Sequence, residues 1–251
     1  MARRILGAGF PLSVWARRPE ALTDFVGKGA VAAASIADLG ASCTHVGICV
    51  VNDADVFTIC DALIPAMQPG SLIAIHSTVL PETCIELDRR CTLGGIRLID
   101  APVSGGGPGA EAGTLTVMCG GSEQAVAQAR PVFESFGKLI THLCGVGAGQ
   151  RAKIVNNALM AANMGLSHAA HGAGEALGID RAALAELIKA SSGRSFGFEV
   201  YARLPEPAAF SQGAPLLAKD VSLLKAILPE DTGAEALRVA AQPFLSAATG
   251  G

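Results

Sequence analysis

The first 145 or so residues alternate short apolar runs with longer stretches of helical periodicity. The apolar runs predict strands at Leu12–Trp15, Val46–Val51, Leu72–His76, Arg97–Ala101, Leu115–Cys119 and Leu139–Leu143. Helices are predicted between them at Asp53–Ala66, Pro81–Arg90 and Ser122–Phe136. Strands that alternate with helices are typical of a doubly wound α/β sheet, so we expect that fold class for this half of the chain.

The pattern changes in the second half of the chain. Residues 150–177 contain no proline and few other helix breakers, which predicts one long helix. A second helix is predicted at Arg181–Ser191, after an aspartate suited to cap it. A proline-rich segment at 205–215 follows, and helix is predicted again from Lys219. We therefore expect residues 148–251 to form an all-helical C-terminal domain.

The Gly-Ala-Gly run at residues 7–9 is similar to the start of a dinucleotide-binding glycine fingerprint, but its surroundings differ from one. Pro11 and the strand Leu12–Trp15 follow it, where the fingerprint requires a helix. We interpret Met1–Leu6 as the end of a helix, with Gly7 or Gly9 as its C-cap. The chain is therefore expected to begin within the first helix of such a unit, without the first strand and phosphate loop.

The composition limits the possible classes of protein. Half of the 251 residues are hydrophobic and 16% are charged, which supports a large core and excludes intrinsic disorder. A net charge of −3 without a basic run argues against nucleic acid as a partner. No apolar run is long enough for a membrane span. The 7 cysteines include no CxxC pair, which indicates free thiols in a reducing cytoplasm.

Three sequence clusters, in a fixed order, identify a family. They are Asp100–Leu115 with its run of glycines, Gly147–Asn157, and Lys219-Asp220. Together they resemble the β-hydroxyacid dehydrogenases, the group of 3-hydroxyisobutyrate dehydrogenase and tartronate semialdehyde reductase. The resemblance covers nearly the whole chain. We expect these 251 residues to lack the family's first strand and glycine fingerprint and to stop short of the family's last helix.

This resemblance implies both a fold and an activity. It implies an NAD(P)-binding Rossmann-like domain over residues 1–147, followed by the all-helical domain. It further implies an NAD(P)-dependent 3-hydroxyacid dehydrogenase or reductase. Such an enzyme interconverts a small β-hydroxy acid and its semialdehyde or oxo acid by hydride transfer.

The segment Ser104, Gly105 and Gly106 follows a strand end, where open α/β sheets bind their ligands. Glycines let backbone N–H groups approach an anion, and the serine hydroxyl adds a donor. We therefore predict that these residues bind a substrate carboxylate. Thr78, together with Ser77, matches a family pair that contacts both cofactor and substrate.

Lys153 is the predicted acid/base residue. Asn156 and Asn157 follow it by three and four residues, so all three share one face of the predicted helix. A lysine in an enclosed site loses its proton more readily than one in water, which suits acid/base chemistry. The resemblance assigns this role to Lys153. The Asn157 amide, one turn away, can orient the ammonium or bind substrate, so we predict that it belongs to the catalytic site. An ordinary solvated helix lysine is the alternative.

Cofactor contacts are predicted at several strand ends. Arg17 and Arg18 follow the most N-terminal strand, where an acidic residue would bind an unphosphorylated ribose and an arginine accommodates a 2′-phosphate. NADP is therefore predicted to be preferred over NAD, with a solvated turn as the alternative reading of these arginines. Val50 and Val51 resemble the family segment along the dinucleotide. Lys219 resembles the family's lysine near the cofactor.

Two further features concern metals and partners. His168, His171 and Glu175 have a spacing that suits metal ligands on one helix face, but no other ligand cluster accompanies them. Helix packing is therefore the preferred account, and no metal is predicted. A helix over 150–177 would extend about 42 Å and outreach a domain of about 100 residues. A partner chain is expected to cover it, as a homodimer or tetramer.

Three other functions are alternatives to a hydroxyacid dehydrogenase. Related imine reductases usually replace the lysine, so Lys153 counts against them. The helical domain of 6-phosphogluconate dehydrogenase is far larger than the roughly 100 residues here. A non-catalytic binding protein that keeps the fold is the third alternative. Hydride transfer from NADPH to semialdehydes would separate these possibilities.

Overall fold

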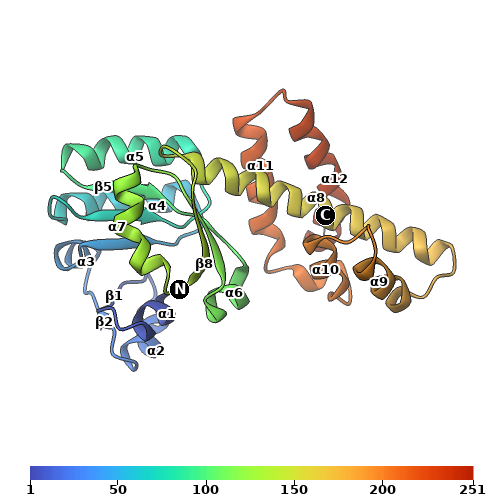
Figure 1. Cartoon of the computed structure of the whole chain (residues 1–251), viewed down its shortest axis with the longest axis horizontal. Helices are drawn as coiled ribbons and strands as arrows, with labels where there is room; N and C mark the ends of the chain where they lie inside the picture. Colours follow the sequence, from blue (N-terminus) through green and yellow to red (C-terminus); the bar gives the residue numbers. More distant parts are fainter. Residues whose placement is uncertain (251) are drawn as a thin grey trace. The chain divides into compact units, whose positions relative to one another are not determined.

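The computed structural model describes residues 1–250, which divide into two compact units, the first spanning Met1–Lys153 and the second beginning at Ile154. The first unit contains, in order, α1 Ala2–Gly7, β1 Ser13–Val14, η1 Pro19–Leu22, α2 Thr23–Val26, β2 Val31–Ala32, α3 Ile36–Ser42, β3 His45–Ile48, α4 Asp53–Leu63, η2 Ile64–Ala66, β4 Leu72–Ile75, α5 Pro81–Leu93, β5 Arg97–Asp100, β6 Val103–Ser104, α6 Gly106–Ala112, β7 Leu115–Cys119, α7 Glu123–Phe133 and β8 Gly137–His142. Figure 1 shows these elements along the chain. The predicted division at residues 147 and 148 falls just before the boundary between the units.

The strands of the first unit are mainly parallel. β1 pairs with β2, and β3, β4 and β5 form a parallel sheet in that order. In the remaining sheet β7 pairs parallel with β8 but antiparallel with the short β6. A single bridge between Asp100 and Gly120 links β5 to the end of β7. The alternation of strands and helices confirms the predicted α/β class, with β6 as an antiparallel addition.

Strand β4 shows why helices cover both faces of this sheet. All of its residues are buried. Ile73 and Ile75 belong to one core cluster, which includes side chains of α4 and α5. Leu72 and Ala74 point the other way, into a cluster that includes Phe133 of α7. A strand that is buried on both faces has apolar residues at every position, and the sequence of Leu72–Ile75 shows this pattern.

The predicted N-terminal helix is present, but its C-cap is Ala8 and not Gly7 or Gly9. Helix α1 spans Ala2–Gly7, and Gly9 follows with a positive φ of 87°. The glycine-rich segment at 105–113, for which no helix was predicted, forms α6. Gly105 and Gly113 adopt positive φ values of 127° and 72°, so glycine serves at both ends of this helix. A Cβ on Gly109 would lie 3.1 Å from the Leu115 side chain, so close packing offsets glycine's low helix propensity.

The second unit is all-helical, as predicted. It contains most of α8 Ala148–Ala176, followed by α9 Arg181–Ala190, α10 Phe196–Ala202, η3 Pro207–Phe210, α11 Ala214–Ile227 and α12 Thr232–Thr249. Helix α11 starts earlier than the predicted Lys219 because Pro215 lies in its first turn, where a missing N–H costs nothing. The core packs Met164 of α8 with Tyr201 and Phe244. Within residues 1–250, no helix has both the length and the apolar character needed to cross a bilayer.

Candidate active site

A buried carboxylate holds the start of the long helix α8. Asp100, at the end of β5, is fully buried and accepts hydrogen bonds from the N–H groups of Gly147 at 2.7 Å and Gln150 at 2.8 Å. Burial raises the pKa of Asp100, and these backbone donors oppose the shift. A Cβ on Gly120 would collide with the carboxylate, and one on Gly149 would lie 2.8 Å from it. The two glycines therefore make room for this helix cap.

The Gln150 side chain links the first turn of α8 to the residues that follow β4. Its amide nitrogen donates to the carbonyl oxygen of Ser77 at 2.8 Å, and its amide oxygen accepts from the N–H of Val79 at 3.1 Å. Thr78 lies between these two anchored residues. Gln150 is fully buried, and Lys153, one turn further along α8, is 9% exposed. Gln150 thus anchors the two neighbours of Thr78 to the helix that carries Lys153.

The end of β3 joins this arrangement. The N–H of Val50 donates to the Ser77 hydroxyl at 2.7 Å, and Val51 beside it is 51% exposed. We call Val50, Ser77, Gln150 and Asp100 the carboxyl-edge network. It ties the carboxyl ends of three neighbouring parallel strands to the first turn of α8. This edge of an α/β sheet is where such folds bind ligands.

The two predicted cofactor arginines differ in their surroundings. The Arg17 guanidinium contacts the Asp55 carboxylate through two nitrogens, at 3.0 and 3.5 Å. Asp55 lies in the first turn of α4 and its side chain is 21% exposed, whereas that of Arg17 is 66% exposed. Arg18 is exposed, and the described residues give its side chain no hydrogen-bond or ion-pair partner. An ion pair therefore reaches across from α4 to the end of β1.

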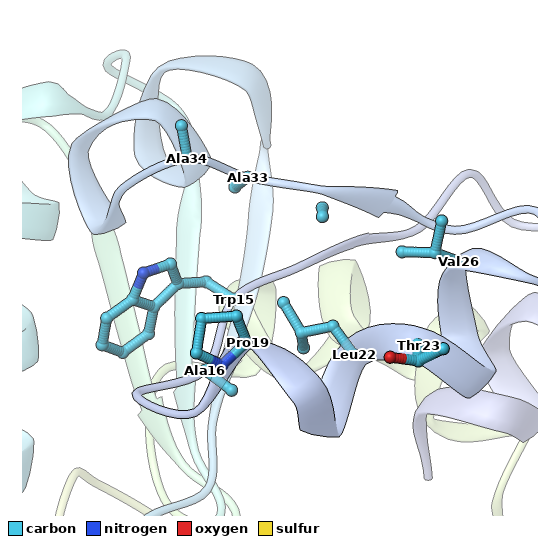
Figure 2. A pocket seen from close by; sticks show the side chains of 9 residues that line it. Trp15, Ala16, Pro19, Leu22, Thr23, Val26, Ala33 and Ala34 are labelled. Carbon is cyan, nitrogen blue, oxygen red and sulfur yellow. The ribbon is translucent and has the colours of Figure 1, made fainter.

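A cavity of about 450 Å³ lies beside this strand end. Figure 2 shows Trp15, Pro19 and Leu22 facing Ala33 and Ala34 across it. Its other lining residues are Ala16, Thr23, Val26 and Ala32. Trp15 is the only tryptophan of the chain and lies two residues before Arg17, so its fluorescence will report on this region.

The predicted carboxylate-binding segment lies on another strand end. Ser104 ends β6, which pairs with β7, and Gly105 and Gly106 follow with positive φ values of 127° and 62°. A Cβ on Gly105 would lie 3.0 Å from the Leu115 side chain. Within residues 1–250 no hydrogen bond joins these three residues to Ser77 or Gln150.

In the second unit, Asp220 connects two predicted site residues. The Asn157 amide donates to one Asp220 carboxylate oxygen at 2.6 Å, and the Lys219 ammonium lies 2.8 Å from the other. Asp220 is buried, with 5% exposure. Asn156 donates to the Asn157 amide oxygen at 3.1 Å. The Asn157 side chain is therefore oriented by α11.

The histidines considered as metal ligands contact aromatic rings. His168 lies 3.0 Å from the Tyr201 hydroxyl, and His171 stacks on Phe198 with ring centroids 5.6 Å apart. Over the part of the chain that the structure describes, no group of three or more histidine, cysteine or acidic side chains is placed to hold a metal ion.

Sequence reasoning missed three polar residues of this region. Asp100 and Gln150 belong to the sequence clusters Asp100–Leu115 and Gly147–Asn157, but the sequence assigned neither residue a role. Asp55 was not predicted as a site residue. The available signal for Gln150 was its position one turn before Lys153, on the same helix face. Nothing in the sequence pairs Arg17 with Asp55, because 38 positions separate them.

Comparisons with known proteins cover both units. Residues 1–145 match the family described as the NAD binding domain of 6-phosphogluconate dehydrogenase. Residues 147–250 match the family described as NAD-binding of NADP-dependent 3-hydroxyisobutyrate dehydrogenase.

Individual relatives extend this likeness. The chain is 37% identical over 242 residues to the NAD-dependent L-serine dehydrogenase of Pseudomonas aeruginosa, covering 89% of this chain and 79% of that protein. It is 36% identical over 208 residues to the mitochondrial 3-hydroxyisobutyrate dehydrogenase of Drosophila melanogaster, covering 82% and 64% respectively. The chain thus spans between 64% and 79% of the length of these two relatives.

Solved structures share the fold over nearly the whole chain. The 3-hydroxyisobutyrate dehydrogenase of Mycobacterium tuberculosis with L-serine superposes with a TM-score of 0.85 at 26% identity, covering 99% of this chain and 90% of that one. Psf3 in complex with NADP+ and 2-OPP also gives a TM-score of 0.85, at 28% identity, covering 97% and 88%.

Proposed function

The chain belongs to the β-hydroxyacid dehydrogenase family of NAD(P)-dependent oxidoreductases, and from this premise we propose that it interconverts a small β-hydroxy acid and the corresponding semialdehyde or oxo acid. The observation that carries the proposal is the pair of hydrogen bonds made by the Gln150 side chain. They anchor Ser77 and Val79, which flank Thr78 at the carboxyl end of β4, and the buried Lys153 lies one turn after Gln150 on α8. A polar strand end anchored to the helix that carries an enclosed lysine is suited to proton transfer at a bound hydroxyl group.

The residues at this edge of the first unit fit a dinucleotide. Arg17 and Arg18 present two guanidinium groups at the end of β1, which suit the anionic adenosine end. Val50, Val51 and Thr78 follow the ends of β3 and β4, where the dinucleotide lies in this fold. When bound, the nicotinamide ring supplies the hydride acceptor or donor.

We assign the proton transfer to Lys153. In the oxidative direction its neutral amine takes the proton of the substrate hydroxyl, and in the reductive direction its ammonium returns that proton to the carbonyl oxygen. A lysine enclosed by protein gives up its proton more readily than one in water, and Lys153 is 9% exposed. Asn157 follows it by one turn of α8 and is proposed to assist, with its amide oriented by Asp220.

The remaining predicted contacts complete the proposal. Ser104, Gly105 and Gly106 are proposed to bind the substrate carboxylate, with Thr78 between substrate and cofactor. Both glycines adopt positive φ values and have no Cβ, so their backbone N–H groups can approach an anion closely. Lys219 is proposed to contact the cofactor, and NADP is proposed to be preferred over NAD because of Arg17 and Arg18.

The test is a screen for hydride transfer. The full chain is incubated with NADPH or NADH and a panel of small semialdehydes, and with NADP or NAD and the corresponding β-hydroxy acids. Loss or gain of the reduced nicotinamide absorbance is followed. We expect turnover of at least one three- or four-carbon acid with the reacting oxygen two carbons from the carboxylate. Cofactor binding without turnover of any of them would instead support a binding protein that keeps the fold.

We also propose that the chain forms a homodimer in a reducing cytoplasm. Helix α8 presents Val155, Leu159 and Leu166 to solvent with exposures of 47%, 50% and 60%. Their spacing of four and seven residues places them on one helix face, which a second copy would cover. The proposed reducing cytoplasm rests on a separate observation, because all seven cysteines are free thiols. Light scattering should show a dimer or tetramer that Leu159→Lys disrupts, and a monomeric parent would contradict this.

A further inference from the structure

An acidic residue is missing where the fold usually supplies one for the cofactor. In this fold an acidic residue at the end of the second strand, about 20 residues after the glycine-rich turn, normally binds an unphosphorylated ribose. The matching segment after β1 carries Ala16, Arg17 and Arg18 instead. The structure brings a carboxylate to the same strand end from another element, because Asp55 of α4 contacts Arg17 at 3.0 and 3.5 Å. We propose that Asp55 selects between the two dinucleotides: it accepts a hydrogen bond from a free ribose 2′-hydroxyl and opposes a 2′-phosphate. This inference rests on the proposed function, since it concerns the same cofactor.

The backbone of α4 fixes the position of Asp55. The Asn52 side chain caps this helix by accepting the N–H of Asp55 at 2.9 Å. The Asp55 side chain is 21% exposed, so it is partly enclosed yet open to a ligand. Its two oxygens face two nitrogens of the Arg17 guanidinium. Any group bound by that guanidinium therefore approaches the Asp55 carboxylate as well.

NADP and NAD would affect the Arg17–Asp55 ion pair in opposite ways. A 2′-phosphate is an anion that competes with Asp55 for Arg17, and it repels the carboxylate at short distance. The competition is possible because Arg17 is 66% exposed, and such surface ion pairs contribute little to stability. A free 2′-hydroxyl leaves the ion pair intact and donates a hydrogen bond to the carboxylate. Asp55 thus favours NAD, while Arg17 and the unpaired Arg18 favour NADP.

Removing the charge of Asp55 should therefore change the two affinities in opposite directions. We expect Asp55→Asn to tighten NADPH binding about three- to tenfold and to weaken NADH binding about two- to fivefold. Arg17→Ala should weaken NADPH binding and leave NADH binding within about twofold. The NADPH effect should shrink at high salt, because the repulsion is screened.

The experiment is calorimetric titration of the full chain with NADPH, NADH, adenosine 2′,5′-bisphosphate and adenosine 5′-monophosphate. The last two probes report on the adenosine end without any chemistry at the nicotinamide. Trp15 fluorescence provides a second readout of the same titrations. The matched control is Asp61→Asn, because Asp61 lies on the same helix and also forms an exposed ion pair, with Arg90. Melting curves show whether each variant remains folded.

The outcomes separate the inference from the proposed function. An NADPH-to-NADH affinity ratio that Asp55→Asn leaves unchanged would overturn the inference while the cofactor assignment stands. Weaker NADPH binding in Asp55→Asn would also overturn it, since Asp55 would then only hold Arg17 in place. A parent chain that binds none of the four probes overturns both. Binding of the dinucleotides without hydride transfer to any substrate overturns the proposed reaction alone.

Discussion

The two ends of the proposed cofactor site are built in different ways. At the catalytic end, Asp100 and Gln150 are fully buried, and backbone groups of Gly147, Ser77 and Val79 satisfy them. At the adenosine end, Arg17 and Asp55 form an ion pair that is open to solvent. Buried polar groups must keep their partners, because losing one leaves the other unsatisfied. In the proposed assignment, buried hydrogen bonds fix the position of the catalytic residues, and a solvent-exposed ion pair sets the choice of cofactor.

The largest expected effect comes from the catalytic end. Lys153→Ala should lower kcat by about 10²–10⁴-fold while cofactor binding changes little, because general acid/base groups typically contribute that much. The measurements are steady-state hydride transfer and NADPH titration of the same sample. Lys189→Ala is the control, since Lys189 forms an exposed ion pair with Glu186 on α9. Activity of Lys153→Ala within a few-fold of the parent would remove this residue from the mechanism.

The support for the catalytic end should be the next most sensitive. Gln150→Leu leaves the Ser77 carbonyl and the Val79 N–H buried without partners, at about 1–3 kcal/mol each. We expect unfolding free energy to fall by about 2–6 kcal/mol and kcat/KM to fall by about 10–100-fold as Thr78 shifts. Gln128→Leu, an exposed glutamine on α7, should change neither quantity by much. Equal effects of the two variants would show that Gln150 is not a special support.

Acid should weaken the buried end of the site. His76 precedes Ser77; burial lowers its pKa to about 4, although its hydrogen bond to the Ala101 carbonyl opposes the shift. The unfolded chain binds a proton near pH 6.5 and the folded chain only near pH 4, so stability falls as pH drops through that window. The full loss is on the order of 3 kcal/mol for this group.

The contribution of His76 is isolated by comparing two variants. Unfolding by denaturant between pH 7 and pH 4 should show a shallower pH dependence in His76→Gln than in the parent. His142→Gln, at an exposed position, should keep the parental slope. The His45 pKa is also lowered to about 4 by burial, so part of the acid sensitivity should remain in His76→Gln. An unchanged slope in His76→Gln would contradict the assignment.

The smallest expected effect concerns the adenosine end. The double variant Arg17→Ala/Arg18→Ala should lower the preference for NADPH over NADH by about tenfold, because it removes the two arginine cations that are proposed to bind a 2′-phosphate. Unfolding free energy should change by less than about 0.5 kcal/mol, as for most surface substitutions. The ratio of kcat/KM with the two cofactors is the measurement. A parent with no preference for NADPH would refute the role of these arginines.

The sequence predicted most of this fold because its signals are local. The uninterrupted helix α8 and the apolar strand β4 follow directly from residue spacing. Helix α6 was missed because its glycines have low helix propensity, and contacts with Leu115 become visible only after folding. The short strands β2 and β6 were missed as well, since two residues carry no periodicity.

The candidate site shows the same division between local and distant information. Lys153 and Thr78 were singled out from motifs within single segments. The contacts that support them join residues far apart in the chain, such as Asp100 and Gln150, which are 50 positions apart. The pairing of Arg17 with Asp55 is of the same kind. Residue spacing carries no signal for such contacts, so only the folded structure reveals them.

The central claim, that Lys153 transfers the proton, is tested most directly by chemical rescue. Lys153→Ala is assayed for hydride transfer with added primary amines of increasing basicity, at saturating NADPH and substrate. We predict that small amines restore turnover in a saturable manner, and that the rescued rate depends on the pKa of the amine, because general acid/base catalysis follows that dependence. Parental activity and cofactor affinity should not respond to the amines. A folded, cofactor-binding Lys153→Ala variant with near-parental turnover in the absence of amines would contradict the account.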